Sequence, residues 1–264
     1  MSSRQEENFL IQKEGRIAKV VVNRPEQRNT FKDAMWCELI DIINKLESDP
    51  EVMVVVITGA GEESFCAGAD ILEMTRKFSP NTNRETVHPV VLATRIIENV
   101  EKVVIAMING YAIGGGCELA IACDMRIAAD SVRIGITQAK IGICISIENV
   151  KQLVDLVGPS KAKDILFTGK LLPAQEALLI GLVDYVVPKK ELELFTMDLA
   201  NVIAQNAPLS ILSAKKSVNI LSGNYNLKEI EDESYFSKKC FLSEDFKEGV
   251  QAFLEKRRPQ FKGK

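Results

Sequence analysis

The chain has 264 residues, 46% of them hydrophobic, so it can bury a full core and form one large domain with a smaller appendage. Its 33 Lys and Arg residues stand against 36 Asp and Glu residues, which gives a formal net charge of −3. No basic block follows the spacing of a phosphate backbone, so composition argues against disorder and against nucleic acid as the main partner.

The first fifteen residues, MSSRQEENFLIQKEG, are polar and acidic. No apolar run follows a basic start, as it does in a secretory or transit signal. Glu118, Asp124 and Arg126 interrupt the most hydrophobic region, so no stretch approaches the roughly 18–20 apolar residues that span a bilayer. We therefore expect a cytoplasmic protein without a membrane segment.

Strand-like and helix-like segments alternate through the first 207 residues. Apolar runs rich in β-branched residues predict strands at Ile17–Val22, Val52–Thr58 and Val103–Ile108. Helical periodicity lies between them, at Phe31–Leu46 and Val90–Val100. This alternation predicts an α/β domain with a mostly parallel sheet.

After about Pro208 the pattern predicts helices only, at Ser210–Leu221, Leu227–Cys240 and Asp245–Lys256. We therefore expect two parts, a core of residues 1–207 and a helical region of residues 208–264. The polar segment Lys77–Val87 predicts a surface loop, and the only histidine, His88, follows it.

Two segments place small residues directly after a predicted strand: SFCAGADI (64–71) and NGYAIGGGCELAIACD (109–124). Glycine lets a ligand approach the backbone, and a helix N-terminus leaves its first N–H groups unpaired. Two such turns facing each other would supply paired donors for an enolate or a tetrahedral oxyanion. Spacing alone does not show that they face each other, and close-packed turns would produce the same pattern.

Glu118 falls in the first turn of the helix expected after the three glycines. The helix dipole favours an acidic side chain there whatever its function. Its apolar neighbours favour instead a carboxylate in an enclosed site, where a raised pKa suits proton transfer. Both interpretations remain open from these residues.

Other catalytic patterns are missing: the sequence has no P-loop, no GxGxxG after a strand, no GxSxG and no HExxH. It also has no CxxC pair, so a zinc site or a disulfide framework is not indicated. We expect the six cysteines to be reduced and mostly buried: Cys37, Cys66, Cys117, Cys123, Cys144 and Cys240.

Taken together, several segments resemble the successive motifs of the crotonase (enoyl-CoA hydratase/isomerase) family. They are VVVNRPEQRNTF (20–31), SFCAGADI, NGYAIGGGCELAIACDMRIAA, GLVDYVVP (181–188) and EGVQAFLEKRRPQF (248–261). The match extends in the right order from about Ile11 to Phe261. The resemblance implies a β-β-α superhelix whose C-terminal helical region assembles trimers, often stacked into hexamers.

The resemblance also implies an acyl-CoA substrate, with no metal and no cofactor beyond the coenzyme A of the substrate. Its oxyanion hole would be formed by the N–H groups of Ala69 and Gly115, with Glu118 as the acid/base. The residues that would contact the substrate or its CoA are Arg28, Ala67, Gly68, Ala69, Asp70, Ile71, Thr137, Ser146 and Lys256. Independently, the basic cluster 256–258 suits an anionic ligand, and equally the C-terminus of a helix.

The sequence departs from the family at the second glutamate of its hydratases. Those enzymes hold one water between two glutamates, the second in a stretch resembling GQPE, which here reads GITQ and ends in Gln138. A carboxamide can orient a water but cannot take or give its proton. The following loop, ICISIEN (143–149), is also unusual. It contains Glu148, which could supply a carboxylate or begin the next helix.

Three reactions suit such a pocket. Hydration requires two groups that handle protons, double-bond isomerisation can use one, and decarboxylation of a malonyl-type thioester mainly needs a stabilised enolate. The segments 191–211 and 255–261 also resemble methylmalonyl-CoA decarboxylases of the same family. We predict a hydratase/isomerase-type enzyme. A decarboxylase, and a CoA-thioester-binding pseudoenzyme or RNA-interacting relative, remain the alternatives.

Overall fold

The computed structural model describes residues 7–71, 73, 89–222 and 238–264. The chain forms two compact units, the first ending at Met197 and the second beginning at Asp198. The division predicted at residues 207 and 208, from the change to a helix-only pattern, stays a prediction.

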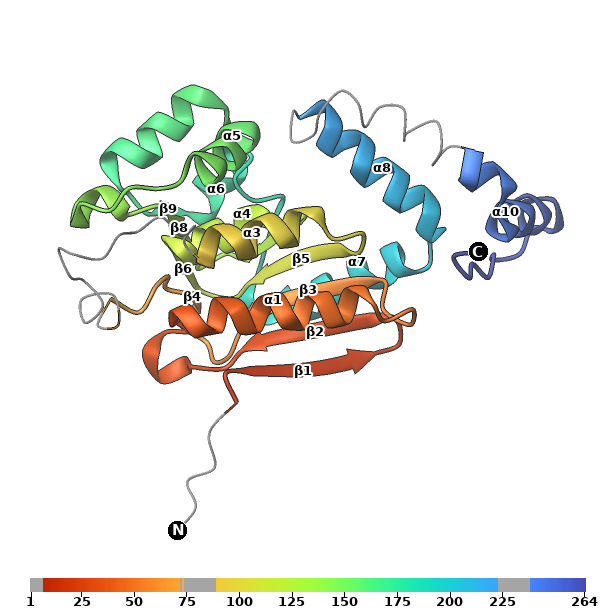
Figure 1. Ribbon diagram of the computed structural model, residues 1–264, viewed down its shortest axis with the longest axis horizontal. Coiled ribbons are helices and arrows are strands. Elements are labelled where there is room, and N and C mark those ends of the chain that lie inside the picture. Colours follow the sequence, from red (N-terminus) through yellow and green to blue (C-terminus); the bar gives the residue numbers. More distant parts are fainter. Residues whose placement is uncertain (1–6, 72, 74–88, 223–237) are drawn as a thin grey trace, which may run out of the picture. The chain divides into compact units, whose positions relative to one another are not determined.

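A six-stranded sheet forms the centre of the first unit (Figure 1). Its order is β1 (Phe9–Glu14), β2 (Ile17–Val22), β3 (Val54–Gly59), β5 (Val103–Ile108), β7 (Met125–Ala129) and β10 (Tyr185–Val187). Only β1 and β2 pair antiparallel, and all other neighbours are parallel. Every residue of β3 and β5 is buried, as expected of a parallel sheet covered on both faces. The predicted mostly parallel α/β fold is confirmed.

The two helices predicted between the first strands are also confirmed, as α1 (Asp33–Glu47) and α3 (Pro89–Asn99). α1 buries one stripe of apolar side chains that recur at helical spacing, among them Met35, Leu39 and Ile43. This stripe carries Trp36 as well, which is 1% exposed. α1 and α3 pack against each other.

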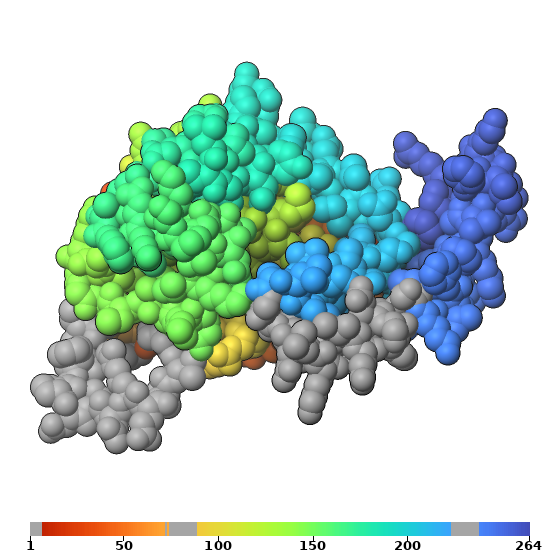
Figure 2. Space-filling view, turned by 90° about the horizontal axis from the view of Figure 1, so that it is seen from above, coloured from red at the N-terminus to blue at the C-terminus, as the bar shows by residue number. Residues whose placement is uncertain are grey.

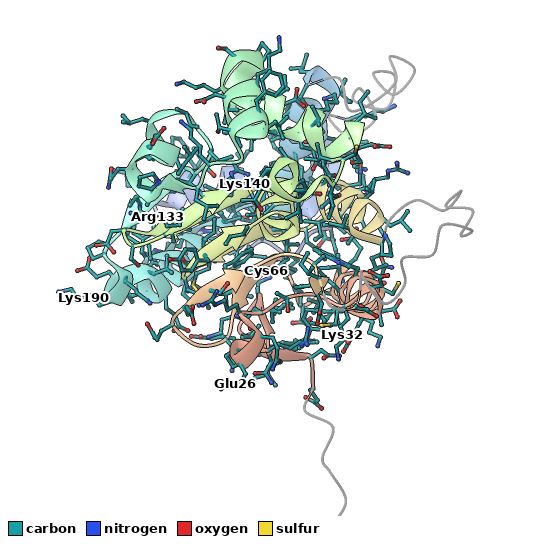
Figure 3. The ribbon with its side chains drawn as sticks, turned by 90° about the vertical axis from the view of Figure 1, so that its left-hand side faces the viewer. Glu26, Lys32, Cys66, Arg133, Lys140 and Lys190 are labelled. Atoms are coloured by element: carbon teal, nitrogen blue, oxygen red, sulfur yellow. The ribbon has the colours of Figure 1, made fainter. Side chains whose placement is uncertain are left out.

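A smaller sheet brings together β4 (Ser64–Cys66), β6 (Tyr111–Ile113), β8 (Arg133–Gly135) and β9 (Leu172–Pro173). β4 and β6 are parallel neighbours, so their carboxyl ends lie at the same edge. Cys66, the last residue of β4, is fully buried inside the first unit (Figure 3). The small-residue turns of segments 64–71 and 109–124 follow β4 and β6, so both begin at this edge.

The other elements of the first unit are mostly helical. They are η1 (Pro25–Gln27), α4 (Gly115–Ala122), η2 (Gln138–Ile141), α5 (Ile147–Thr168), α6 (Ala174–Leu179) and η3 (Lys189–Glu191), and α7 (Leu192–Ala204) continues into the second unit. α5 is interrupted at Gly158, where φ is 74°, directly before Pro159. Residues of α5, in green, form part of the molecular surface in Figure 2.

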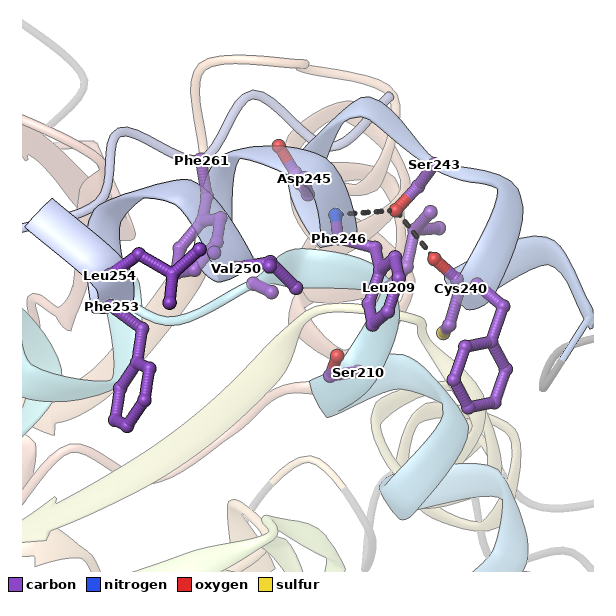
Figure 4. A pocket seen from close by; sticks show the side chains of 13 residues that line it. Leu209, Ser210, Cys240, Ser243, Asp245, Phe246, Val250, Phe253, Leu254 and Phe261 are labelled. Carbon is purple, nitrogen blue, oxygen red and sulfur yellow. Dashed lines mark hydrogen bonds between the residues drawn. The ribbon is translucent and has the colours of Figure 1, made fainter.

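The second unit contains α8 (Pro208–Leu221) and α10 (Glu244–Glu255), close to two of the three predicted helices. The third, predicted at 227–240, lies largely outside the described residues. Between α8 and α10 is an apolar groove of about 510 Å³ (Figure 4). Its lining includes Phe246, Val250 and Phe261, and Phe253 at its edge is 82% exposed.

The six cysteines are free, but burial was predicted wrongly for Cys37 and Cys144, and Cys240 is only half-buried. Cys37 faces solvent from α1, and Cys144 lies in the exposed loop before α5. His88 and the segment 77–87 lie outside the described residues. In the part of the chain that the structure describes, no helix has both the length and the apolar character to cross a membrane.

Candidate active site

The two small-residue turns meet at the shared edge of β4 and β6. A Cβ atom placed on Gly68 would lie 3.3 Å from the backbone nitrogen of Gly115. A Cβ placed on Gly115 would lie 3.8 Å from the backbone nitrogen of Ala69. The turns that sequence spacing could not relate to each other are therefore adjacent, because parallel neighbouring strands end at one edge.

Two of the three consecutive glycines have separate structural requirements. Gly114 has φ of 56° and ψ of −119°, a conformation that a side chain disfavours. A Cβ on Gly116 would lie 1.9 Å from the carbonyl oxygen of Cys66, so α4 can pack against the end of β4 only with glycine there. These requirements fix the N-terminus of α4 beside the Ala67–Ala69 turn.

The N–H groups of Ala69 and Gly115 form no hydrogen bond with any other described backbone group. Gly115 is the first residue of α4, where an N–H has no acceptor within its own helix. Two hydrogen bonds to Phe31 hold the turn on either side of Ala69. The N–H of Phe31 donates to the Gly68 carbonyl, and the N–H of Asp70 donates to the Phe31 carbonyl, each at 2.8 Å. Two adjacent donors are thus held in position with no backbone acceptor in the part of the chain that the structure describes.

Trp36 closes one side of these donors. Its Cζ2 atom would lie 3.3 Å from a Cβ placed on Gly115. Its indole N–H is buried and has no hydrogen-bond partner among the described residues. Since Trp36 is the only tryptophan in the chain, its fluorescence should report on any ligand that enters this site.

Glu118 lies one helical turn into α4 and is 4% exposed. Its Oε1 accepts a hydrogen bond from Nε2 of Gln138, and its Oε2 accepts one from Nδ2 of Asn149. Burial raises the pKa of the Glu118 carboxyl, and the two amide donors act in the opposite direction because they favour its ionised form. Such a group is suited to taking up and releasing a proton.

Gln138, predicted from sequence to stand near Glu118, contacts it directly from η2. Its Oε1 is buried without a hydrogen-bond partner among the described residues. Thr137 directly precedes η2. Ser146 accepts a hydrogen bond from the N–H of Asn149 at 3.2 Å and thereby caps α5. The predicted contacts of Thr137 and Ser146 with a substrate stay predictions.

Asn149 and Thr94 are the polar members of the site that sequence reasoning missed. Each is 1% exposed, and Oγ1 of Thr94 lies 3.0 Å from Oδ1 of Asn149. Asn149 shares a buried stripe of α5 with Gln152 and Leu153, at i, i+3 and i+4. This periodicity is visible in the sequence and could have indicated a buried amide.

Glu148, the alternative source of a second carboxylate, faces elsewhere. It lies in the first turn of α5 and pairs with Arg95 at 3.2 Å, where both side chains are about half exposed. Two thiols near the site are not nucleophiles at neutral pH, because burial raises the pKa of Cys66 to about 12 and also raises the pKa of Cys117. Among the described residues, no group of three or more His, Cys, Asp or Glu side chains could hold a metal ion.

The residues predicted to bind CoA lie partly around the Ala67–Ala69 turn. The N–H of Ala67 donates to the carbonyl of Arg28 at 3.0 Å, and the Arg28 side chain is 65% exposed. Asp70 pairs with Arg24 at 3.4 Å, and Ile71 is 49% exposed. Lys256 belongs to the second unit, where it caps the C-terminus of α10.

Comparison with known proteins agrees over nearly the whole chain. Residues 12–264 match the profile of the enoyl-CoA hydratase/isomerase family. A short-chain-enoyl-CoA hydratase of Clostridium acetobutylicum is 39% identical, over 95% of this chain and 96% of the relative. A crotonyl-CoA hydratase of Syntrophomonas wolfei is 37% identical, over 97% of this chain and 98% of the relative. The crystal structure of an enoyl-CoA hydratase from Bacillus anthracis has a TM-score of 0.90 and 35% identity, covering 98% of this chain and 100% of that one.

Proposed function

Since the chain belongs to the enoyl-CoA hydratase/isomerase family and is an acyl-CoA enzyme of that type, we propose that it moves a double bond along the acyl chain. The observation that carries this proposal is the identity of the two groups on Glu118. Both are side-chain amides, from Gln138 and Asn149, and neither can act as a general acid or base at neutral pH. Of hydration and double-bond isomerisation, only isomerisation can be completed by a single carboxylate.

The reaction begins with a thioester whose double bond joins C3 and C4. The ionised carboxylate of Glu118 takes a proton from C2, and the electron pair moves onto the thioester carbonyl oxygen. The N–H groups of Ala69 and Gly115 donate to that oxygen and stabilise the enolate. Glu118 then returns its proton to C4, the enolate collapses, and the double bond joins C2 and C3. No proton is gained or lost overall, so a second acid/base group is not needed.

The CoA part of the substrate would lie along the exposed side chain of Arg28 and the turn formed by residues 67–71. This placement is supported by the hydrogen bond from the Ala67 N–H to the Arg28 carbonyl. That bond holds the exposed guanidinium, which can bind an anionic ligand, next to the turn that carries one of the unpaired N–H groups. Thr137 and Ser146 would face the acyl group. Lys256, from this chain or from a neighbouring subunit, would contact the CoA phosphates.

A homotrimer or a hexamer is part of the same proposal. The support within the second unit is its apolar groove, whose edge exposes Phe253 and Leu254 by 82% and 73%. Exposed apolar surface of this kind usually marks an interface with another protein. A second copy of the chain is the partner that a closed symmetric assembly requires.

Hydration is the second candidate, because the two relatives with the identities given above are named as hydratases. A water held between Glu118 and Gln138 could donate to the buried Oε1 of Gln138, which has no partner among the described residues. Glu118 would then have to take the proton of the water and also protonate C2. Gln138 could orient the water but could not take or give its proton, a task that two-glutamate hydratases divide between two carboxyl groups, so hydration is the weaker candidate.

Turnover of three thioesters separates the possibilities. We expect 3-butenoyl-CoA to be converted to crotonyl-CoA faster than crotonyl-CoA is hydrated, with methylmalonyl-CoA unchanged. Fluorescence of Trp36 measures binding in the same samples. Faster hydration would favour the second candidate, and loss of CO₂ from methylmalonyl-CoA would favour a decarboxylase. Binding of all three without turnover would indicate a pseudoenzyme and overturn the proposal.

A further inference from the structure

Asn149 contacts the carboxyl group that the proposed reaction depends on, and nothing in the motifs of the sequence marks it. We infer that Asn149 is a positioning residue for Glu118, and that Thr94 holds the other end of the Asn149 amide. This inference rests on the proposed function, because it concerns the same carboxylate. In this inference Asn149 of α5 donates to Glu118, and the hydroxyl of Thr94 in α3 contacts Asn149.

The three side chains form a continuous chain of hydrogen bonds across three helices. Nδ2 of Asn149 donates to Oε2 of Glu118, and Oγ1 of Thr94 lies 3.0 Å from Oδ1 of Asn149. Glu118 is 4% exposed, and Asn149 and Thr94 are each 1% exposed. Asn149 and Thr94 are therefore shielded from bulk solvent, and their polar atoms depend on protein partners.

The carboxylate of Glu118 distinguishes the two ends of the Asn149 amide. A carboxylate only accepts, so the amide NH₂ must face Glu118 while Glu118 is ionised. The amide oxygen then faces Thr94, whose hydroxyl is the donor there. That hydroxyl also lies 3.1 Å from the carbonyl of Val91, so two acceptors compete for its single proton. Rotation of the amide would place its oxygen against the carboxylate and would break the bond to Glu118.

The side chain of Asn149 is more tightly constrained than that of Gln138, so the two donors to Glu118 differ. Gln138 is only partly buried, lies in the short η2, and has a second amide atom without a partner among the described residues. Asn149 is held at both ends of its amide, and its backbone N–H is fixed by Ser146 at the start of α5. Gln138 can thus adapt to a ligand, whereas Asn149 keeps the carboxyl group in one place.

Charged groups near the site have partners of their own. Arg126, at the start of β7, pairs with Asp184 at 2.8 Å, and Glu148 of α5 pairs with Arg95 of α3 at 3.2 Å. Glu98 of α3 accepts a hydrogen bond from Gln152 at 2.9 Å. The carboxyl group of Glu118 therefore depends on the two amides rather than on an ion pair, and removal of one amide donor should favour its protonated form.

The test replaces each member of the chain by a side chain of similar shape. Asn149→Leu removes the donor, Thr94→Val removes the hydroxyl, and Thr94→Ser restores it. The readouts are the acid limb of the kcat profile and the titration of the Glu118 carboxyl by ¹³C NMR, assigned by its loss in Glu118→Gln. Circular dichroism and quenching of Trp36 fluorescence by acyl-CoA confirm that each variant folds and binds.

We expect Asn149→Leu to move the acid limb upward by about one pH unit, equal to about 1.4 kcal/mol, and to lower kcat at least tenfold with KM nearly unchanged. Thr94→Val should move it in the same direction by less, and Thr94→Ser should restore it. An unmoved acid limb and carboxyl titration in both Asn149→Leu and Thr94→Val would overturn the inference. If Glu118→Gln keeps full turnover, the proposed function itself is wrong. If Glu118→Gln is inactive while Asn149→Leu and Thr94→Val behave like wild type, only the positioning role is wrong.

Discussion

Replacing Gln138 by glutamate tests the departure that separates this chain from two-glutamate hydratases. Gln138 already contacts Glu118, so Gln138→Glu places two carboxyl groups at hydrogen-bonding distance around the site of a possible water. The new carboxyl also takes the position of a neutral amide that now donates to Glu118. The substitution therefore removes one donor and adds one titratable group, with little change in side-chain volume.

The size of the effect follows from the contact. Two unit charges about 4 Å apart interact by about 4 kcal/mol at an effective dielectric constant of about 20. That repulsion equals roughly three pKa units, and it adds to the burial that already raises the pKa of Glu118. The pair should therefore share one proton at neutral pH, with one carboxylate to activate water and one carboxylic acid to protonate C2.

We expect Gln138→Glu to increase the rate of crotonyl-CoA hydration by more than tenfold, since one positioned acid/base group is typically worth about 10²–10⁴-fold. Release of CO₂ from methylmalonyl-CoA, if wild type shows any, should fall, because a new negative charge disfavours binding of the substrate carboxylate. Gln138→Leu is the matched control, as it removes the amide without adding a carboxyl group. Unchanged hydration in Gln138→Glu with intact acyl-CoA affinity would refute the reasoning.

Further predictions concern the oxyanion donors, the buried carboxyl and the assembly. Gly115→Pro should lower kcat by about 10²–10³-fold, because it removes one N–H donor. Gly115→Ala keeps that N–H, so its kcat should fall much less. Equal falls in kcat in the two folded variants would argue against that donor. Burial raises the pKa of Glu118 above 4.5, so its contribution to stability is fully present below the unfolded-state pKa and lost as pH rises through the folded-state pKa. The unfolding free energy of wild type minus that of Glu118→Gln, from urea titrations, should therefore decrease with rising pH, and a constant difference would contradict it. Analytical ultracentrifugation should give a mass that is a multiple of three subunits, and Phe253→Asp should lower it; a stable wild-type monomer at micromolar concentration would oppose the assembly.

Hydrophobic periodicity predicted most of the fold. Ile17–Val22 and Val103–Ile108 are strands with the predicted bounds, because β-branched residues in short apolar runs suit a buried parallel sheet. Val52–Thr58 was displaced by one or two residues, as element ends often are. Burial of Cys37 was wrong because α1 turns that position toward solvent while Trp36 faces the core.

The site was less accessible to sequence reasoning, because its parts meet only in three dimensions. Motif resemblance indicated Glu118 and Gln138 as neighbours, and they are in contact. The adjacency of the turns at Ala69 and Gly115 depends on the pairing of β4 with β6, which spacing along the chain does not contain. Asn149 stood beside Glu148 in an irregular segment, and only the first turn of α5 decides which of the two faces the interior.

The most direct test of the central claim is the fate of a deuterium atom placed on C2 of 3-butenoyl-CoA. If Glu118 alone moves the proton, part of the label should appear on C4 of the crotonyl-CoA product, with the remainder lost to solvent. Glu118→Gln should form no product while it still quenches the fluorescence of Trp36 on binding. Crotonyl-CoA formed by Glu118→Gln at the wild-type rate, with the same transfer of label, would contradict the account.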